Sequence, residues 1–543
     1  MRRIDASDIA PILPKTLGPD SPGYAFALID GEEVQTLCQG IASLEHRVKI
    51  TPDTAFRIAS VTKHFLALVA QICHNRGVIN LDAPLGRYIG ELGGIQANVS
   101  LRQALQNCSG IRDHLELAMM AGGGLDQPVS AAQSLEMIAR QQQTNFPPGT
   151  NFLYSNSNFL LVTLAVERQT GLGLGDLMEE HLFRPNAMSA TFYEPLHAAV
   201  IPNLASGYID TEIGFTRGQF ATELAGEGAL VSTLNDLVRW YRYLRADPDG
   251  LVALIATPTT FENGTTGHYA MGLFNRAYLG SATRSHNGLW PGYRADLVRF
   301  DDLDAGAICL VNVNTADPTA MTRKVMCAVY PGQLSQRLAA PDPALFELLT
   351  DGSVYLNDDT LEMARFSADG DGLNIDIGGW AMTHEITGPS RVDFSLPTDY
   401  LSLDWSEVAA GRVILKRING DKVILQKVSE SDIPTNAAHL EGVFTCPDLP
   451  STLTISNQDG TFVAELRGGF AHRGDWCVTQ VTVDIFMLTD DSGPWPRQLT
   501  AQRIDGGRAL RLSGARVKNM RFDSAHAIAK RQRAMRNKDS YQR

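Results

Sequence analysis

The sequence predicts an α+β fold in its first part and two all-β domains in its second. Two apolar, strand-like runs at residues 24–29 and 34–43 flank the hairpin signal D-G-E-E, so the chain opens with an antiparallel pair. Helical spacing dominates the middle, and strand-like runs return at residues 269–278, 282–286, 293–300 and 307–313. We expect one antiparallel sheet with flanking helices and a helical subdomain, followed by two barrel-like or sandwich-like modules.

Apolar spacing and capping signals give the helices of the first part. They are expected at residues 60–74, 101–106, 131–142, 159–170, 232–244 and 318–329. Glycines that can take a left-handed conformation, Gly77 and Gly171, follow the first and fourth of these segments.

The length of 543 residues exceeds what one hydrophobic core organises and indicates about three domains. The first is expected at residues 1–333, and a Pro-Asp-Pro stretch at 334–344 is typical of a linker. Residues 344–430 and 437–523 show short alternating strands and turn pairs with hardly a helical run, as in all-β barrels. Residues 524–543 form a basic tail, which we interpret as a solvated terminus rather than a functional arm.

The composition excludes several classes of protein. Hydrophobic residues make up 44% and charged residues 20%, as in an average globular protein. The net charge of −13 argues against a nucleic-acid partner, which would need a basic face. No apolar run is long enough to cross a membrane, and Asp5, Asp8 and Pro11 interrupt the place of a signal peptide. A protein without membrane or nucleic-acid partners is predicted.

Seven cysteines are scattered along the chain without C-x-x-C spacing. This pattern predicts a reduced, cytoplasmic protein. Cys108 and Cys477 lie in polar stretches, where a reactive thiol and a small buried side chain are both compatible with the sequence. No H-E-x-x-H motif or cluster of ligands indicates a metal, and no cofactor is expected.

The candidate chemistry centres on Ser60 and Lys63, three residues apart at the start of the first predicted helix. Residues at this spacing are neighbours on a helix, so the Lys63 amine can reach the Ser60 oxygen and help to remove its proton. The helix amino end also favours negative charge, so it could hold an oxyanion. A serine placed in this way can be acylated, whereas the alternative is a capping serine beside a solvated lysine.

Two further motifs follow in order: Tyr154 with Asn156 in a loop of the helical region, and His286 with Gly288 on a late strand. Each has a plain alternative, since Tyr154 could be half-buried after a proline turn and Asn287 with Gly288 could form a hairpin turn. Together with S-x-x-K they resemble the serine β-lactamase and penicillin-binding-protein superfamily, whose S-x-x-K, Y-x-N and H-x-G or K-T-G elements converge on one cleft. The resemblance implies a β-lactamase-like catalytic domain.

Two stretches of the first domain, at residues 107–113 and 146–156, and the two β domains resemble the D-aminopeptidase branch of this superfamily over essentially the whole chain. The resemblance implies a serine hydrolase that releases an N-terminal D-residue such as D-alanine from peptides, amides or esters. It also implies that no metal is needed. Partner binding or homodimer formation through the β domains stays open.

The resemblance also implies roles for individual residues. Ser60 would be the acylated nucleophile, and Lys63 with Tyr154 would carry its proton to the leaving amine, with the identity of the base left open. Asn156 would orient Lys63 and the substrate amide. His286 would donate to the substrate or to the tyrosine. The last motif would also supply Gly288, beside which the substrate backbone passes, and the N–H group of Leu289, which would complete an oxyanion hole with that of Ser60.

An aminopeptidase must also bind a charged amine, for which a carboxylate is the simplest partner. The family places a loop of the last β domain in the cleft for this purpose. The matching stretch is residues 468–476, and Asp475 is the candidate for the ammonium contact, although Gly474 and Asp475 could form only a surface turn.

Other readings of the motifs stay open. A D,D-carboxypeptidase, a β-lactamase or an esterase would use the same three motifs, but those enzymes meet cell-wall substrates outside the cytoplasm, and no export signal is recognised in this sequence. A non-catalytic penicillin-recognising protein is less compatible with an intact set of Ser60, Lys63, Tyr154 and Asn156.

Overall fold

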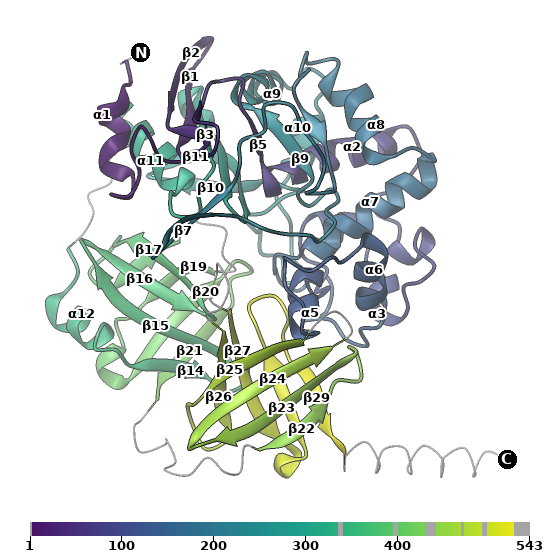
Figure 1. The fold of residues 1–543 in the computed structure, drawn as a ribbon, viewed down its shortest axis with the longest axis vertical. Helices are drawn as coiled ribbons and strands as arrows, with labels where there is room; N and C mark the ends of the chain where they lie inside the picture. The colour runs from purple at the N-terminus through teal and green to yellow at the C-terminus, as the bar shows by residue number, and fades with distance from the viewer. Residues whose placement is uncertain are drawn as a thin grey trace. The chain divides into compact units, whose positions relative to one another are not determined.

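The computed structural model describes residues 3–334, 340–394, 400–428, 441–468, 472–490 and 497–525. The chain forms two compact units, coloured by residue number in Figure 1. The first unit comprises Met1–Ile111, Pro128–Leu135 and Phe146–Gln336, and the second comprises Arg112–Gln127, Glu136–Asn145 and Arg337–Arg543. The second unit therefore includes two segments from the helical region.

A six-stranded antiparallel sheet with the order β10-β11-β12-β13-β1-β2 organises the first unit. Its strands are β1 (Tyr24–Asp30), β2 (Glu33–Gln39), β10 (Phe274–Tyr278), β11 (Ser281–Trp290), β12 (Tyr293–Phe300) and β13 (Ala305–Val311). The opening hairpin and the return of the chain to the same sheet confirm the predicted topology. In β1, Tyr24, Phe26 and Leu28 pack in one core, and the alternate residues are also buried, because helices cover both faces.

Helices α1 (Ala6–Ile9) and α11 (Pro318–Val329) contribute to the core on one face, while α9 (Leu234–Ala246) contacts β1 and β13. The bounds of α11 are those predicted, because Asp317 caps the helix and a proline occupies its first position. For α9 the expected start was wrong by two residues: Ser232 lies in strand β9 (Leu230–Thr233), and Thr233 is the cap.

The helical part of the first unit carries one of the longest helices, α2 (Lys63–Asn75), against α7 (Asn156–Thr170) and α10 (Leu251–Ile255). Shorter helices are α3 (Gly94–Ala97), α4 (Leu101–Leu105) and α8 (Leu174–Met178), and α6 (Ala131–Ala139) runs from one unit to the other. Three small sheets complete the first unit: β3 (Ile41–Ser43) with β4 (Val48–Lys49); β5 (Ala55–Arg57), β9 and β6 (Phe192–Tyr193); and β7 (Tyr208–Thr211) with β8 (Gly214–Arg217).

The second unit contains two β assemblies, as expected. One is an eight-stranded sheet with the order β17-β16-β15-β14-β21-β20-β19-β18, and the other is a closed barrel of β22 to β29. The strands of the first are β14 (Val354–Asn357), β15 (Glu362–Asp369), β16 (Gly372–Ile377), β17 (Trp380–Glu385), β18 (Arg391–Asp393), β19 (Tyr400–Asp404), β20 (Arg412–Arg417) and β21 (Lys422–Lys427). Those of the barrel are β22 (Gly442–Thr445), β23 (Ser451–Gln458), β24 (Thr461–Gly468), β25 (His472–Gln480), β26 (Ile485–Asp490), β27 (Arg497–Ile504), β28 (Ala509–Ser513) and β29 (Met520–Ser524).

One helix was missed at the entrance to the second unit. The expected linker ends in α12 (Pro343–Leu349), capped by Asp342, whose carboxylate accepts from the N–H groups of Ala344 and Leu345. Asp-Pro at a helix start was mistaken for a linker signal. Residues 335–339, in the same predicted linker, lie outside the described residues, as do residues 526–543 of the basic tail.

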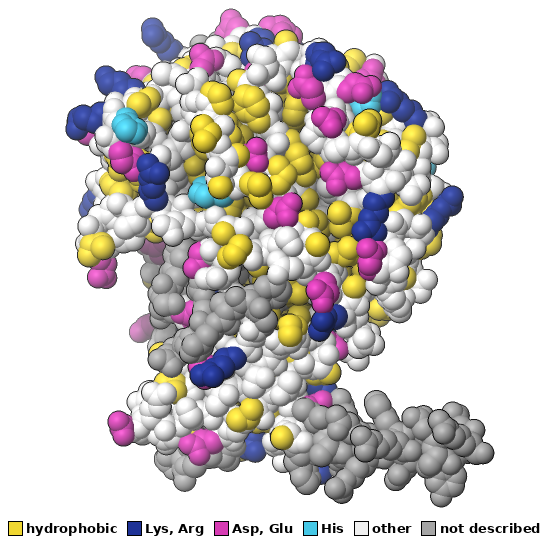
Figure 2. All heavy atoms as spheres, turned by 45° about the vertical axis from the view of Figure 1, so that its right-hand side comes forward, with side chains coloured by type: hydrophobic (Ala, Val, Ile, Leu, Met, Phe, Trp, Pro, Cys, Tyr) yellow, Lys and Arg dark blue, Asp and Glu magenta, His cyan; other side chains and the backbone are white. Residues whose placement is uncertain are grey.

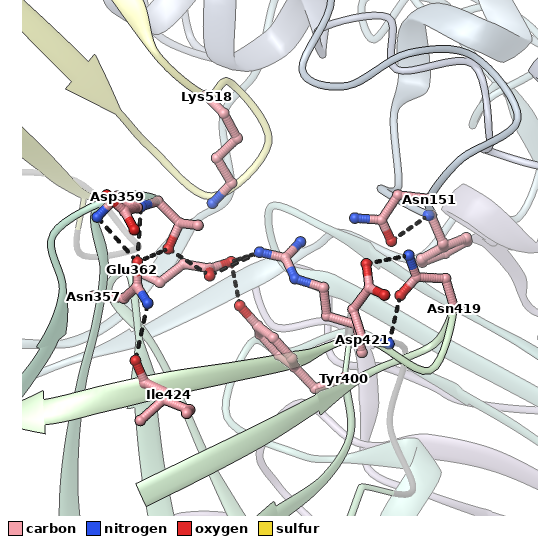
Figure 3. Close-up of polar contacts among 12 residues, drawn as sticks. Asn151, Asn357, Asp359, Glu362, Tyr400, Asn419, Asp421, Ile424 and Lys518 are labelled. Carbon is pink, nitrogen blue, oxygen red and sulfur yellow. Dashed lines mark hydrogen bonds and ion pairs between the residues drawn. The ribbon is translucent and has the colours of Figure 1, made fainter. Parts of the chain in front are cut away.

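A buried ion pair stabilises the eight-stranded sheet (Figure 3). Glu362 is 4% exposed and accepts two hydrogen bonds from Arg417, at 2.7 and 2.8 Å, and one from Tyr400. Desolvation opposes ionisation of Glu362, but the charges of Arg417 and of Lys518, which belongs to the β28–β29 loop, outweigh it and lower its pKa. The carboxylate is therefore kept charged in a dry position.

Helix α5 (His114–Met120) packs on the closed barrel within the second unit. Arg112 donates to the carbonyl of Lys518 at 3.1 Å, and Glu116 accepts from the N–H of Arg516. Asn145 pairs with the same loop in both directions, donating to Arg516 and accepting from Lys518. The β28–β29 loop is thus held by residues that lie 371 to 406 positions earlier in the chain.

Acidic and basic side chains are interspersed on the face shown in Figure 2. Within the described parts of the chain, no helix is long and apolar enough to cross a membrane. Nor do three or more His, Cys, Asp or Glu side chains there gather as a metal site would require. All seven cysteines are free thiols; Cys108 is buried with its pKa raised to about 12 by desolvation, whereas Cys477 is exposed.

Candidate active site

Ser60 lies on a tight turn between strand β5 and helix α2. The turn is a 3-10 segment, Ala59–Thr62, which leads directly into the α-helix. Ala59 has a φ of +48°, an uncommon conformation for a residue with a side chain. The Thr62 hydroxyl donates to the Ala59 carbonyl at 2.6 Å and accepts from the N–H of Leu230 at 3.2 Å. These contacts hold the backbone of the turn in its strained form.

Lys63 is fully buried, and its Nζ atom lies 3.1 Å from the Ser60 oxygen. Nζ also lies 2.9 Å from Oδ1 of Asn156 and 2.7 Å from the carbonyl oxygen of Glu227. The last two oxygens can only accept hydrogen bonds. A neutral amine has two N–H groups and one lone pair, so this geometry leaves the lone pair for the Ser60 hydroxyl. The expected contact between Ser60 and Lys63 is present.

Tyr154 and Asn156 stand at the start of α7, where Ser155 is the residue before the first turn. The Lys63 Nζ atom lies 4.8 Å from the centre of the Tyr154 ring and 5.0 Å from that of Phe159. Aromatic faces favour a nearby cation, so the two rings partly compensate the burial of a charged Lys63. The second motif is therefore assembled directly on the first.

His286, Gly288 and Leu289 lie in the second half of β11. Strand β10 pairs with β11 as far as Ser285, and residues 286–290 pair only with β12 among the described strands. The alternative of a hairpin turn at Asn287 and Gly288 is wrong, because both are paired within the strand. A Cβ atom on Gly288 would lie 2.1 Å from the Ile58 carbonyl oxygen. The glycine thus allows the Ser60 turn to approach this strand.

His286 is 1% exposed, and both of its ring nitrogens have neighbours. Nδ1 lies 2.6 Å from the Asn287 carbonyl oxygen and Nε2 lies 3.3 Å from the Tyr269 hydroxyl. Burial, and then the charge of Lys63, lower its pKa well below the ordinary value for histidine. The imidazole is neutral at neutral pH.

The predicted amine contact, Asp475, belongs to strand β25 of the second unit, and its side chain lies outside the described residues. Residues 469–471 of the same predicted loop also lie outside them. Its role remains a prediction.

Three contributors to the site were not predicted: the Glu227 carbonyl, Asn107 and Tyr269. Asn107 accepts from the N–H of Ser155 at 3.0 Å and from Asn158 at 2.9 Å, which fixes the start of α7. Asn107 has a φ of +55°, in the left-handed region in which asparagine is enriched. This signal is visible only in the structure, so the sequence alone could not identify Asn107 as part of the site. Tyr269 begins an apolar run and was assigned to a strand that in fact starts at Phe274.

A sequence model of the beta-lactamase family matches residues 16–329 of the chain. The chain belongs to the beta-lactamase family. The match includes the Ser60 turn, the start of α7 and strand β11. Membership of this family confirms the resemblance stated from the motifs.

Several curated relatives are named D-aminopeptidase. The D-aminopeptidase of Brucella ovis is 28% identical over 385 residues, which cover 69% of this chain and 72% of the relative. That of Brucella anthropi is 24% identical over 515 residues, covering 91% and 93%. The second alignment extends the resemblance beyond the family model into the β domains.

Solved structures show the same fold. An octameric penicillin-binding protein homologue from Pyrococcus abyssi superposes with a TM-score of 0.55 at 17% identity, covering 87% of this chain and all of that one. A D-amino acid amidase from Ochrobactrum anthropi SV3, in complex with D-phenylalanine, gives a TM-score of 0.50 at 23% identity, covering 60% and 98%. The predicted β-lactamase-like fold with all-β domains after it is confirmed.

Proposed function

We propose that this chain is a serine hydrolase that releases an N-terminal D-amino acid, such as D-alanine, from peptides, amides or esters. One observation carries the chemistry: the buried Lys63 amine lies 3.1 Å from the Ser60 oxygen, with two carbonyl-type acceptors on its other sides. The relatives named D-aminopeptidase support the class of substrate.

In the acylation step, the Lys63 amine takes the Ser60 proton as the serine oxygen attacks the carbonyl carbon of the first residue. The proton then passes, with the help of the Tyr154 hydroxyl, to the leaving nitrogen or oxygen, and the bond to the leaving group breaks. An ester on Ser60 remains. Water attacks that ester, its proton returns to the Ser60 oxygen by the same groups, and the D-amino acid leaves.

The edge of β11 supports a position for the substrate. Because residues 286–290 lack a strand on the β10 side among the described elements, an extended substrate can add there as a short strand. The N–H groups of Ser60 and Leu289 are the proposed donors to the oxyanion that forms during attack. Gly288 keeps this strand close to the serine turn.

Aminopeptidase activity also needs a group for the substrate ammonium, and Asp475 remains our candidate for it. A cytoplasmic location and a homodimer remain predictions as well. The principal alternative within the family is attack at the other end of a peptide, as in a D,D-carboxypeptidase.

A matched set of substrates separates these alternatives. We would compare a D-alanine anilide with a free amine, its L-isomer, its N-acetylated form and a peptide that ends in D-Ala-D-Ala. Cleavage of only the free-amine D-compound supports the proposal. Cleavage of the acetylated compound or of the C-terminal bond would show that the chemistry is right and the direction of attack is wrong.

Substitution Ser60→Ala tests the nucleophile. We expect activity to fall by about 10³-fold or more, since the acyl-enzyme cannot form. Covalent labelling by a fluorophosphonate, followed by mass spectrometry, should place the adduct on Ser60 in the unaltered protein and give none in the variant. Undiminished hydrolysis by a variant with the same melting temperature would contradict the mechanism.

A further inference from the structure

Tyr269 lies between the second and third motifs of the site. It is 1% exposed, and its ring centre is 6.3 Å from that of Tyr154 and 6.0 Å from that of His286. Its hydroxyl oxygen is 3.3 Å from Nε2 of His286. The mechanism above gives Tyr269 no proton to carry. Its hydroxyl group nevertheless lies in the dry interior beside the reacting groups, where a hydroxyl needs a hydrogen-bond partner.

The direction of this contact follows from the other nitrogen of the ring. The Asn287 carbonyl can only accept, so Nδ1 of His286, 2.6 Å away, carries a hydrogen. In a neutral imidazole Nε2 then has a free lone pair, and the Tyr269 hydroxyl is the donor. Burial favours this arrangement, since desolvation raises the pKa of Tyr269 well above that of an exposed tyrosine and the hydroxyl keeps its proton.

Asn107 approaches the same hydroxyl from the second motif. Its Oδ1 atom accepts from the N–H of Ser155 and from Nδ2 of Asn158, so the amide is held in one orientation. Among the described residues, Nδ2 of Asn107 has no partner within hydrogen-bonding geometry, but the amide acts against the rise in the pKa of Tyr269. Tyr269 thereby stands between Asn107, which fixes the start of α7, and His286, which lies on β11.

We propose that Tyr269 is a positioning residue that joins the second and third motifs, because its hydroxyl donates to Nε2 of His286 and holds the ring as a neutral acceptor. The hydrogen of the ring is then on Nδ1 and is used by the Asn287 carbonyl. His286 then has no N–H group left for the substrate or for Tyr154. Its Nε2 atom accepts from Tyr269, whereas the motif led us to expect that His286 donates. This proposal rests on the proposed function in one respect: it assumes that the reaction takes place at Ser60.

The groups around His286 are consistent with a neutral ring. Lys63, on α2, is the cation that acts on it, and a second positive charge beside Lys63 is unfavourable. His64, the next residue of α2, accepts from Trp240 at 2.8 Å and is kept neutral by burial, with its pKa lowered to about 3. Tyr154 and Phe274 present rings, at 6.1 and 5.4 Å between centres.

Nitrogen-15 NMR of the full-length protein, labelled at histidine, tests the state of the ring directly. The signals of His286 are assigned by their loss in His286→Gln. We expect one protonated nitrogen, Nδ1, and one unprotonated nitrogen, Nε2, from pH 6 to 8. A proton on Nε2, in either a neutral or a charged ring, would overturn the proposal. This experiment needs neither a substrate nor a variant of Tyr269.

Substitution Tyr269→Phe tests the positioning role. Tyr293→Phe is the matched control, because Tyr293 is 2% exposed and also loses one hydrogen bond, to the Ala205 carbonyl at 2.7 Å. In Tyr269→Phe we expect the Nε2 signal of His286 to move and kcat to fall about tenfold, as for the loss of one buried hydrogen bond, with KM little changed. In Tyr293→Phe the signal and kcat should stay as they are, whatever happens to the melting temperature.

The result is separable from a failure of the proposed function. If the D-alanine anilide is not a substrate, the rate of labelling of Ser60 by the fluorophosphonate replaces kcat as the readout. An unchanged Nε2 signal in Tyr269→Phe, or labelling and turnover equal to those of the unaltered protein, would overturn the proposal. Equal losses of activity in Tyr269→Phe and Tyr293→Phe would also overturn it. The loss would then be explained by the reduced stability that both variants have in common.

Discussion

Three of the hydrogen-bond contacts of Lys63 explain how a buried amine can serve as a base. Two of them, the Asn156 amide oxygen and the Glu227 carbonyl, can only accept, and the third is the Ser60 hydroxyl. A charged ammonium fills all three positions by donating, whereas the neutral amine donates to two and accepts from Ser60. The site therefore accommodates both forms of Lys63 without moving its neighbours, which is what proton transfer requires.

Substitution Lys63→Arg separates a base from a mere positive charge. Arginine keeps the charge but cannot be deprotonated in proteins, so we expect the rate to fall by about 10²- to 10⁴-fold, as for the loss of a general base. In Lys63→Met the rate should fall by a similar factor. The measurement is kcat/KM for the D-alanine anilide, with circular dichroism as the check on folding. An arginine variant that kept more than about a tenth of the activity would contradict the role of Lys63 as base.

At this scale the sequence predicted the local pair best. Ser60 and Lys63 are neighbours because helix geometry makes them so, and no tertiary information is needed. Asn107, Tyr269 and the Glu227 carbonyl reach the site only through the packing of distant segments. A backbone carbonyl has no signature in the sequence, and a tyrosine in an apolar run resembles any core tyrosine.

Strand β11 connects the sheet to the serine turn. The hypothetical Cβ of residue 288 would lie 2.1 Å from the Ile58 oxygen and 3.1 Å from the Ala59 side chain. A backbone oxygen cannot move aside as a flexible side chain can. The strand and the turn therefore meet at a place that only glycine can fill.

Substitution Gly288→Ala should displace the Ser60 turn. We expect a loss of stability of about 1–3 kcal/mol from overpacking and a greater loss of activity than of stability, since the displaced residues belong to the site. Gly90→Ala is the control, because a Cβ there meets nothing within 4 Å. Thermal unfolding and anilide hydrolysis are the measurements. A Gly288→Ala enzyme as active as Gly90→Ala would refute the close approach.

The buried ion pair of the eight-stranded sheet, between Glu362 and Arg417, leads to a second prediction. Arg417→Met leaves the Glu362 carboxylate buried without its main partner, and we expect a loss of about 3–5 kcal/mol in the unfolding free energy. Arg391→Met is the control, because its pair with Asp393 is exposed and such pairs contribute about 0–1 kcal/mol. Urea unfolding measures both, and equal effects of the two changes would contradict the prediction.

The elements predicted most accurately are those whose ends carry capping or turn residues in the sequence. Helix α11 was bounded correctly because Asp317 and Pro318 mark its start. The start of β10 was placed too early because residues 269–273 form a turn, in which Gly272, at a φ of +76°, lies against the backbone of Lys63 and His64. That turn is imposed by a neighbour in space, and an apolar run alone does not reveal it.

At the scale of the whole molecule, the order of fold types was predicted, whereas the membership of the second unit was not. Residues 112–127, for which no helix was predicted, and residues 136–145, which include the end of a predicted helix, were assigned to the first domain, but they group with the barrel. Arg112, Glu116 and Asn145 bind the β28–β29 loop there. Such an exchange of segments leaves no trace in hydrophobic periodicity.

Glu116 gives the second unit a dependence on pH. Desolvation, opposed by the charges of Lys518 and Arg516, raises its pKa from 4.5 to about 7. A raised pKa means that the folded state binds the proton more tightly than the unfolded state. The contribution of Glu116 to stability is therefore fully present below about pH 4.5 and is lost as the pH rises to about 7.

Substitution Glu116→Gln tests this dependence. Relative to the unaltered protein, we expect the variant to gain about 1–3 kcal/mol in unfolding free energy between pH 4.5 and pH 8. Urea unfolding at the two pH values measures it. Glu136→Gln is the control, because that glutamate is exposed on α6 and pairs only with Arg140 at 2.6 Å among the described contacts. Parallel curves for Glu116→Gln and the unaltered protein would exclude the predicted linkage.

The discontinuous second unit also sets the order of events during synthesis. A ribosome releases residues 112–145 long before the β28–β29 loop to which they bind, so these segments must wait while some 370 further residues are made. Domains usually fold as their chains emerge, beginning with the N-terminal one. Here the contacts between this part of the chain and the β28–β29 loop can form only after Lys518 has been made. A nascent chain that stops before Gly514 therefore lacks the backbone groups of Arg516 and Lys518 that Glu116 and Arg112 bind.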